Sequence, residues 1–206
     1  MLRLYDEETG NVEEITTARP GVVRVACAGG LRALLVGDLI RRLADHHRLR
    51  AIGVWDDVPG AADLGVRPAE LTAGDADVHV GAAVGHCSLA SADGLDPLAV
   101  RLALLQRHYR SDVDLSRQDL EEADGSLVSW RREVAGWAES PGRPLNREWV
   151  REAVAALDDD LDTPAIFPML SRLAEDDSVP PGAKFETVIK LDMILGLDLV
   201  ALVGRL

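Results

Sequence analysis

Two pairs of residues stand where an α/β protein binds small molecules. Asp56 and Asp57 follow an apolar run at 51–55, and Gly29 and Gly30 follow a β-branched run at Val22–Cys27. Parallel sheets bind ligands at the carboxyl ends of their strands, so the aspartates could contact a substrate amine and the glycines could approach a phosphate. Structural interpretations compete with both: aspartates often cap a turn, and a glycine pair outside a complete motif is weak evidence for phosphate binding.

The two cysteines are the candidate metal ligands. Cys27 ends the β-branched run, and Cys87 follows His86 directly. Zinc takes four Cys, His or carboxylate ligands, and closely spaced pairs such as C-x₂-C identify such sites in a sequence. This chain has no pair with that spacing. We therefore favour structural cysteines, because a thiol at the end of a buried strand is usually inert, and keep a zinc site at Cys27, His86 and Cys87 as the alternative.

A small α/β unit must position these residues. Residues 2–15 alternate apolar and polar side chains around Thr9 and Gly10, which predicts a hairpin. Strands over Val22–Cys27 and 51–55, joined by a helix over 31–47, make a βαβ unit and predict a parallel sheet. The Gly-, Ala- and Asp-rich region from 56 to 96 shows one further short strand, at 78–81.

From Pro97 onward the pattern is helical. Helices are predicted over 97–110, after the N-caps Ser116, Asn146 and Thr163 (the last followed by Pro164 at the first helical position), and after residue 182 as far as a C-cap at Gly196. Pro168 is expected to kink or shorten the fourth of these. The predicted fold is a reduced Rossmann-like α/β domain over residues 1–95, followed by a helical bundle domain over 96–206.

Charge and composition narrow the range of partners and locations. The net charge of −13 opposes binding to nucleic acid, and the arginine clusters lie on helical patterns typical of solvated faces, so a tRNA partner is not expected. No apolar run approaches the length of a membrane helix, and the N-terminus lacks the pattern of a signal peptide. Two cysteines make no disulfide framework, so a cytoplasmic protein is expected.

An ordered series of segments resembles the class I cysteinyl-tRNA synthetase family. It runs from Leu4-Tyr5-Asp6 through residues 34–43 and 54–57 to residues 195–199. Its most specific segment, 92–105 continuing into His108-Tyr109-Arg110-Ser111, resembles the shorter branch of that family, the ligase that joins cysteine to glucosaminyl-inositol in mycothiol biosynthesis. The resemblance covers most of the chain except about residues 56–90. It implies a Rossmann-like sheet, a helical domain and kinship with cysteine-activating enzymes.

Both ATP-handling motifs of that family are missing. Only residues 28–33 join Cys27 to the first helix, where the family has a HIGH-type motif, and residues 85–91 contain no lysine, where it has a KMSKS-type loop. Losing one donor that stabilises developing charge typically costs about 10² to 10³ in rate. ATP binding and standard cysteine activation are therefore not expected. Cys27 falls at the position of the family's first ligand to the zinc that holds the substrate thiolate.

The resemblance and its departures favour a truncated, degenerate paralog that binds a protein partner or a small molecule without catalysis. The alternative is an enzyme that transfers cysteine or another amino acid to a small amine or a carrier, with a phosphate site rebuilt around Gly29, Gly30 and Arg32. Aminoacylation of tRNA is a weaker third hypothesis. A homodimer is also expected, because shortening the parent α/β domain should leave apolar surface to cover.

Overall fold

A three-stranded parallel sheet forms the base of the molecule. The computed structural model describes residues 2–6 and 9–205; Met1, residues 7–8 of the predicted hairpin and Leu206 lie outside the described residues. The sheet has the order β4-β3-β5, with β3 (Val22–Cys27) between β4 (Arg50–Val54) and β5 (Val78–Val80). In register, Val25 lies opposite Gly53 on one side and Val78 on the other. This confirms the predicted Rossmann-like sheet.

Two smaller strand pairs accompany the sheet. The hairpin β1 (Arg3–Asp6) and β2 (Asn11–Glu14) is antiparallel, as predicted. β6 (Cys87–Leu89) and β7 (Val113–Leu115) form a parallel pair that the sequence did not predict. Each is three residues long and its partner is distant in sequence, so neither carries a periodic signal of its own.

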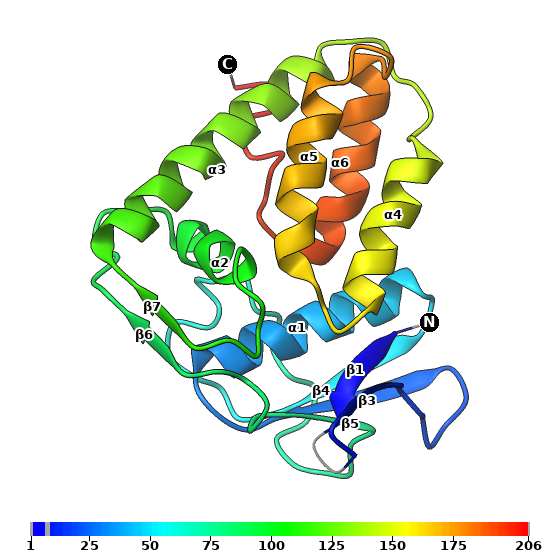
Figure 1. The fold of residues 1–206 in the computed structure, drawn as a ribbon, viewed down its shortest axis with the longest axis vertical. Helices are drawn as coiled ribbons and strands as arrows, with labels where there is room; N and C mark the ends of the chain where they lie inside the picture. The colour runs from blue at the N-terminus through cyan, green and yellow to red at the C-terminus, as the bar shows by residue number, and fades with distance from the viewer. Residues whose placement is uncertain (1, 7–8, 206) are drawn as a thin grey trace.

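Helix α1 (Leu31–His46) lies between the sheet and the other helices (Figure 1). Twelve of its 16 residues are buried, including the polar residues Arg32, Asp38 and Arg41. A helix covered on both sides must bury more than one apolar stripe, which explains the nearly continuous apolar run from residue 33 to residue 40. The polar residues within it therefore need partners in the interior.

The helical part contains α2 (Pro97–Leu105), α3 (Arg117–Ala138), α4 (Arg147–Asp158), α5 (Ile166–Glu175) and α6 (Pro181–Leu195). The predicted caps are confirmed. Ser116 forms a capping box with Asp119, the Asn146 side chain accepts from the backbone of residues 148 and 149, and Gly196 adopts the left-handed conformation with φ 66°. These caps fix the helix ends at the positions that the sequence predicted.

Three predictions in this half were wrong. The first helix ends at Leu105 instead of about residue 110. The side chain of Asp162, not Thr163, caps the short 3-10 helix Thr163–Ala165 that precedes α5. Pro168 causes no break, because it is the third residue of α5, where a helix has no N–H bond to lose.

One hydrophobic core contains side chains from both halves of the chain, from Leu2 and Val23 to Leu195 and Leu199. The two predicted domains therefore share a core through α1, and their division near residue 95 stays a prediction. Among the described residues, none of the helices combines the length and the apolarity that crossing a bilayer requires.

Candidate functional site: a pocket at the carboxyl edge of the sheet

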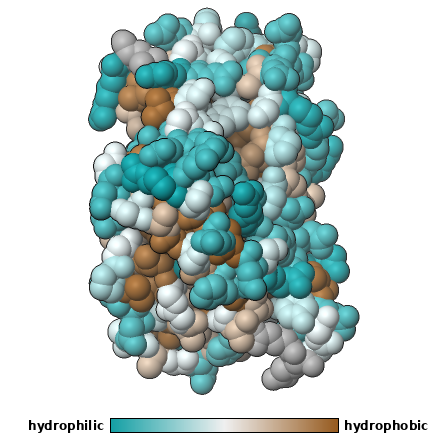
Figure 2. Space-filling view, turned by 60° about the vertical axis from the view of Figure 1, so that its left-hand side comes forward, coloured by the Kyte–Doolittle hydropathy of each residue, from teal (hydrophilic) through white to brown (hydrophobic). Residues whose placement is uncertain are grey.

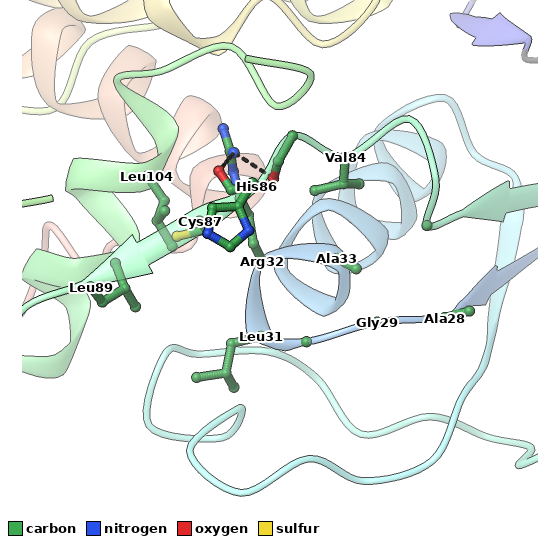
Figure 3. Close-up of a pocket in the computed structure, with 13 residues that line it drawn as sticks. Ala28, Gly29, Leu31, Arg32, Ala33, Val84, His86, Cys87, Leu89 and Leu104 are labelled. Carbon is green, nitrogen blue, oxygen red and sulfur yellow. Dashed lines mark hydrogen bonds between the residues drawn. The ribbon is translucent and has the colours of Figure 1, made fainter. Parts of the chain in front are cut away.

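The sheet has a topological switch point between β3 and β5. The chain leaves β3 through α1 and returns on one side as β4, whereas β5 pairs with the other side of β3. Open α/β sheets bind ligands outside the carboxyl ends of the strands at such a point. A pocket of about 460 Å³ lies there, which we call the switch-point pocket. Its lining consists of residues 28–33, Gly81, residues 84–87, Leu89 and Leu104 (Figure 3).

The two glycines after β3, Gly29 and Gly30, line the pocket and have backbone features that suit this position. Gly29 has φ +138°, a backbone conformation that side-chain-bearing residues rarely adopt. Gly30 is the N-cap of α1 and provides no side-chain cap, and the first turn of α1, residues 31–33, lines the pocket. Directly after the neighbouring strand β5, a Cβ on Gly81 would lie 2.9 Å from the Ala28 carbonyl oxygen. The two strand ends therefore approach more closely than larger residues allow.

Arg32 also lines the pocket, but its guanidinium is already bonded to the main chain. Nη1 donates to the carbonyl oxygens of Gly85 at 2.9 Å, His86 at 3.2 Å and Ser111 at 2.7 Å. Nη2 donates to the His108 carbonyl at 3.0 Å. Burial lowers the pKa of Arg32. Its observed role is to hold the start of α1 against two loops, the one at residues 85–86 and the one at residues 108–111. A contact with phosphate would require these hydrogen bonds to break.

His86 and Cys87 form the polar wall of the pocket. They come from the start of β6, and Figure 3 shows the His86 ring beside the Cys87 sulfur. The His86 backbone N–H donates to the Asp112 carboxylate at 2.7 Å, which fixes this segment against the residues before β7. Burial raises the pKa of the Cys87 thiol more than the nearby Arg32 lowers it, so the thiol stays protonated at neutral pH.

Cys27 lies in the core instead of the pocket. Its sulfur packs so closely against Gly37 of α1 that a Cβ at position 37 would collide with it. Burial raises the pKa of Cys27 to about 12. The structure does not assemble Cys27, His86 and Cys87 into a cluster, and no group of three or more His, Cys, Asp or Glu residues in the described part of the chain could hold a metal ion.

Asp56 and Asp57 follow Trp55 at the carboxyl end of β4, as the sequence predicted, and both are exposed. They are not among the residues that line the switch-point pocket. Because β4 and β5 flank β3 on opposite sides, the aspartates lie at the same edge of the sheet but across β3 from the Gly81 wall. The structure thus brings Gly29, Gly30, Arg32, His86 and Cys87 together and leaves the aspartate pair outside.

Sequence reasoning missed a buried ionic network in α1, the helix whose first turn lines the pocket. The carboxylate of Asp38, which is fully buried in α1, contacts three arginines: Arg42 at 2.7 Å, Arg67 at 3.0 Å and Arg101 at 2.9 Å. The available signal was an aspartate inside an otherwise apolar helical run. A charge in that position is costly unless it is paired, so the sequence could have indicated a buried partner without identifying it.

Comparison with known proteins relates the chain to cysteine ligases. No family model matches it. It is 40% identical over 114 residues to the L-cysteine:1D-myo-inositol 2-amino-2-deoxy-alpha-D-glucopyranoside ligase of Streptomyces griseus, a match that covers 52% of this chain and 26% of the relative. The ligase of the same name from Thermobispora bispora is 41% identical over 107 residues, covering 50% and 25%, respectively. That from Acidothermus cellulolyticus is 36% identical over 108 residues, covering 52% and 26%.

These similarities confirm the predicted relationship to the cysteine ligases of the mycothiol pathway, a family related to cysteinyl-tRNA synthetases. The matches cover about half of this chain and about a quarter of each relative. Kinship is therefore established, whereas the activity, substrates and partners of the whole ligases are proposals for this chain.

Proposed function

We propose that this chain is a ligase-derived binding protein, which takes a small amino-acid-like molecule in the switch-point pocket without activating it. The observation that carries this proposal is the state of Arg32. It is the one arginine or lysine in the pocket lining, and its Nη atoms already donate to four carbonyl oxygens. Adenylation needs cationic groups aimed at the phosphates, and this lining offers none that is free.

The lining favours a small ligand with an apolar part. Its volume of about 460 Å³ is in the usual range of small-molecule sites, and Leu31, Val84, Leu89 and Leu104 supply apolar walls. A single carboxylate can be held by backbone N–H groups such as those at the start of α1. A triphosphate carries several charges and needs more than these donors. An amino acid or an aminoacyl derivative therefore fits the pocket better than free ATP.

An amino-acid ligase or transferase is the second candidate, and the names of the relatives favour it. All three relatives described above are ligases that join cysteine to an amino sugar, by their names. For this chain, the candidate requires phosphate-binding cations from outside the switch-point pocket. Transfer would proceed to a small amine or a carrier in preference to tRNA, because the acidic chain repels a phosphate backbone.

The exposed hydrophobic residues do not form one large patch in the part of the chain that the structure describes. On the face that carries α3, β6 and β7, hydrophobic residues gather in separate patches between polar ones (Figure 2). The large hydrophobic residues that are exposed, Leu71, Leu89, Met193 and Val200, are spread over the chain. A homodimer stays a prediction, and sedimentation equilibrium over a range of concentrations would test it.

Calorimetric titration tests the proposed function. The ligands are L-cysteine, a non-hydrolysable cysteinyl-adenylate analogue and ATP. We expect heat from cysteine or the analogue and none from ATP alone. Leu89→Trp should fill the pocket and abolish the signal, whereas Leu71→Trp is the matched control, because Leu71 is equally exposed (41% against 39%) and lies beside β4.

Three outcomes would contradict the proposal. Retained binding in the Leu89→Trp variant would place the ligand elsewhere, and equal loss of binding in both tryptophan variants would show that the loss does not come from filling the switch-point pocket. Cysteine-dependent exchange of pyrophosphate into ATP would establish the ligase candidate instead, because exchange requires reversible formation of an aminoacyl-adenylate.

A further inference from the structure

A second concave surface lies along α4, which we call the α4 groove. One face of the helix lines it at the spacing of a helical stripe: Arg147, Val150, Arg151, Val154, Ala155 and Asp158. The neighbouring stripe, with Ala153 and Leu157, is buried in the core, and Val154 lies at the border between the two and is buried as well. Leu145 and His46, from the end of α1, complete the groove, which has a volume of about 430 Å³. The helix thus presents a second partly apolar face away from the core.

The groove is positively charged in an acidic chain. Arg147 and Arg151 are exposed, and neither forms an ion pair or hydrogen bond with another described residue. Lys190 of α6 is close enough to His46 to lower its pKa, an effect second to that of burial. The acidic group in the lining, Asp158, is 2.6 Å from Nε2 of His47.

Other acids of α4 do not neutralise the groove. Glu148 and Glu152 are outside its lining, and Glu152 pairs with Arg172 of α5 at 2.9 Å. Elsewhere, the guanidinium groups of Arg32, Arg101 and Arg131 are occupied by interior acceptors. The two arginines of the groove are available for a partner, and unlike the exposed Arg132 of α3 they lie in one concave surface beside the apolar residues Leu145, Val150 and Val154.

We propose that the α4 groove binds an acidic amphipathic helix of a partner protein. Arg147 and Arg151 are one helical turn apart, so two carboxylates at the same spacing on a partner helix can pair with both. The floor of Leu145, Val150 and Val154 takes an apolar side chain between them. The rest of the chain repels an acidic peptide, which directs it to the groove. This surface is separate from the switch-point pocket and does not depend on the function proposed there.

A nucleic acid would use the arginines but not the apolar floor. Phosphate contacts come from cations and N–H donors, and single strands add stacking on aromatic rings, but the groove lining contains no Phe, Tyr or Trp and only the small ring of His46. The observations therefore favour a peptide. A polar substitution in the apolar floor should weaken binding of a peptide and leave binding of a nucleic acid unchanged. Such a substitution therefore distinguishes the two kinds of partner.

Fluorescence anisotropy with the full chain tests the proposal. The probe is a fluorescein-labelled helical peptide of leucine, alanine and glutamate, with glutamates four residues apart; the comparison is a labelled oligouridylate of equal charge. We expect the peptide to bind, and Arg151→Glu to weaken it by at least about tenfold. Arg132→Glu, an exposed arginine of α3 with the same charge change, should alter binding by less than about twofold.

The floor variant decides between the occupants. Val150→Asn keeps the charge and should weaken the peptide, while circular dichroism confirms that the helices are retained. Equal effects of Arg151→Glu and Arg132→Glu would overturn the proposal, since they would indicate attraction to net charge alone. So would absence of peptide binding to the unsubstituted chain, or tighter binding of the oligouridylate that is insensitive to Val150→Asn.

Discussion

Nη2 of Arg101 lies 2.9 Å from Oδ2 of Asp38, and neither side chain is exposed to solvent. The same guanidinium donates to the carbonyl oxygens of Leu195 at 2.6 Å and Leu64 at 3.0 Å. One side chain of α2 therefore connects the buried face of α1, the loop after β4 and the end of α6. This relationship joins the sheet that carries the switch-point pocket to the helical part.

Breaking this pair is expected to destabilise the protein strongly. Arg101→Leu leaves the Asp38 carboxylate buried with one partner fewer, and loss of one member of a buried pair typically costs about 3 to 5 kcal/mol. Glu121→Ala is the control, because the Glu121–Arg117 pair is exposed and such pairs contribute about 0.5 kcal/mol or less. Urea unfolding measures both, and a loss below about 1 kcal/mol for Arg101→Leu would contradict the assigned role.

The carboxyl groups of the buried Asp38 and the partly buried Asp192 should give the free energy of unfolding opposite dependences on pH. Burial alone would raise the pKa of Asp38, but Arg101 and Arg42 outweigh it and hold the pKa below its ordinary value. Its contribution is therefore present above the ordinary pKa and is lost as pH falls through the folded pKa. Burial raises the pKa of Asp192, so its contribution is present below the ordinary pKa and is lost as pH rises through the folded pKa.

The measurement is the difference in unfolding free energy between the unsubstituted chain and each of Asp38→Ala and Asp192→Ala, from about pH 3 to pH 7. The difference should grow with pH for Asp38→Ala and shrink for Asp192→Ala. Asp192 also accepts hydrogen bonds from the backbone N–H groups of Leu197 and Leu199, both at 2.8 Å. Because Asp192→Ala removes these bonds at every pH, the difference in unfolding free energy will contain a constant loss in addition to the part that changes with pH. Parallel curves for the two variants would show that the opposed shifts are absent.

Arg32 is predicted to act on loop structure and not on phosphate. Arg32→Met removes the donors to four carbonyl oxygens, and we expect a loss of about 2 to 4 kcal/mol because four part-buried charge-assisted hydrogen bonds are lost together. Arg132→Met, at an exposed position, should change stability by less than about 0.5 kcal/mol. Hydrogen exchange of the amides near His86 and Val113 should accelerate in the first variant alone. Unchanged exchange there would refute the loop-tying role.

Two helical glycines should respond oppositely to alanine. At Gly37 the new Cβ collides with the Cys27 sulfur, so Gly37→Ala should cost about 1 to 3 kcal/mol. At Gly136, in α3, a Cβ meets nothing within 4 Å, and alanine should stabilise the helix by about 0.5 to 1 kcal/mol. Adding Cys27→Ala to Gly37→Ala should recover part of the loss. Strictly additive effects would show that the two positions are uncoupled.

Elements with a local signal were predictable. The β-branched run Val22–Cys27 became the central strand at the predicted bounds, and Ser116, Asn146 and Gly196 ended helices through caps that involve residues within one turn. Such signals need no knowledge of the tertiary fold. The position of Gly29 and Gly30 at a ligand pocket followed from the same strand and the rule for carboxyl ends of parallel sheets.

What could not be predicted depends on contacts between distant segments. Strands β6 and β7 are too short for a periodicity, and their pairing depends on the fold of the intervening helix α2. The role of Arg32 depends on carbonyl oxygens more than 50 residues away, at Gly85 and Ser111. A sequence displays an arginine next to a glycine pair and suggests a phosphate, but it does not display the loops that occupy its guanidinium.

Four buried arginines, Arg32, Arg41, Arg101 and Arg131, hold their neighbouring segments mainly by main-chain carbonyl oxygens. Every residue type carries a carbonyl oxygen, so these attachments place no demand on the identity of the residue that accepts. Segments such as the one around Ser111, whose side chain is exposed, can therefore change in sequence while their path is retained. For a protein engineer, the four arginines are the positions to leave alone, and the loops that they hold are open to redesign.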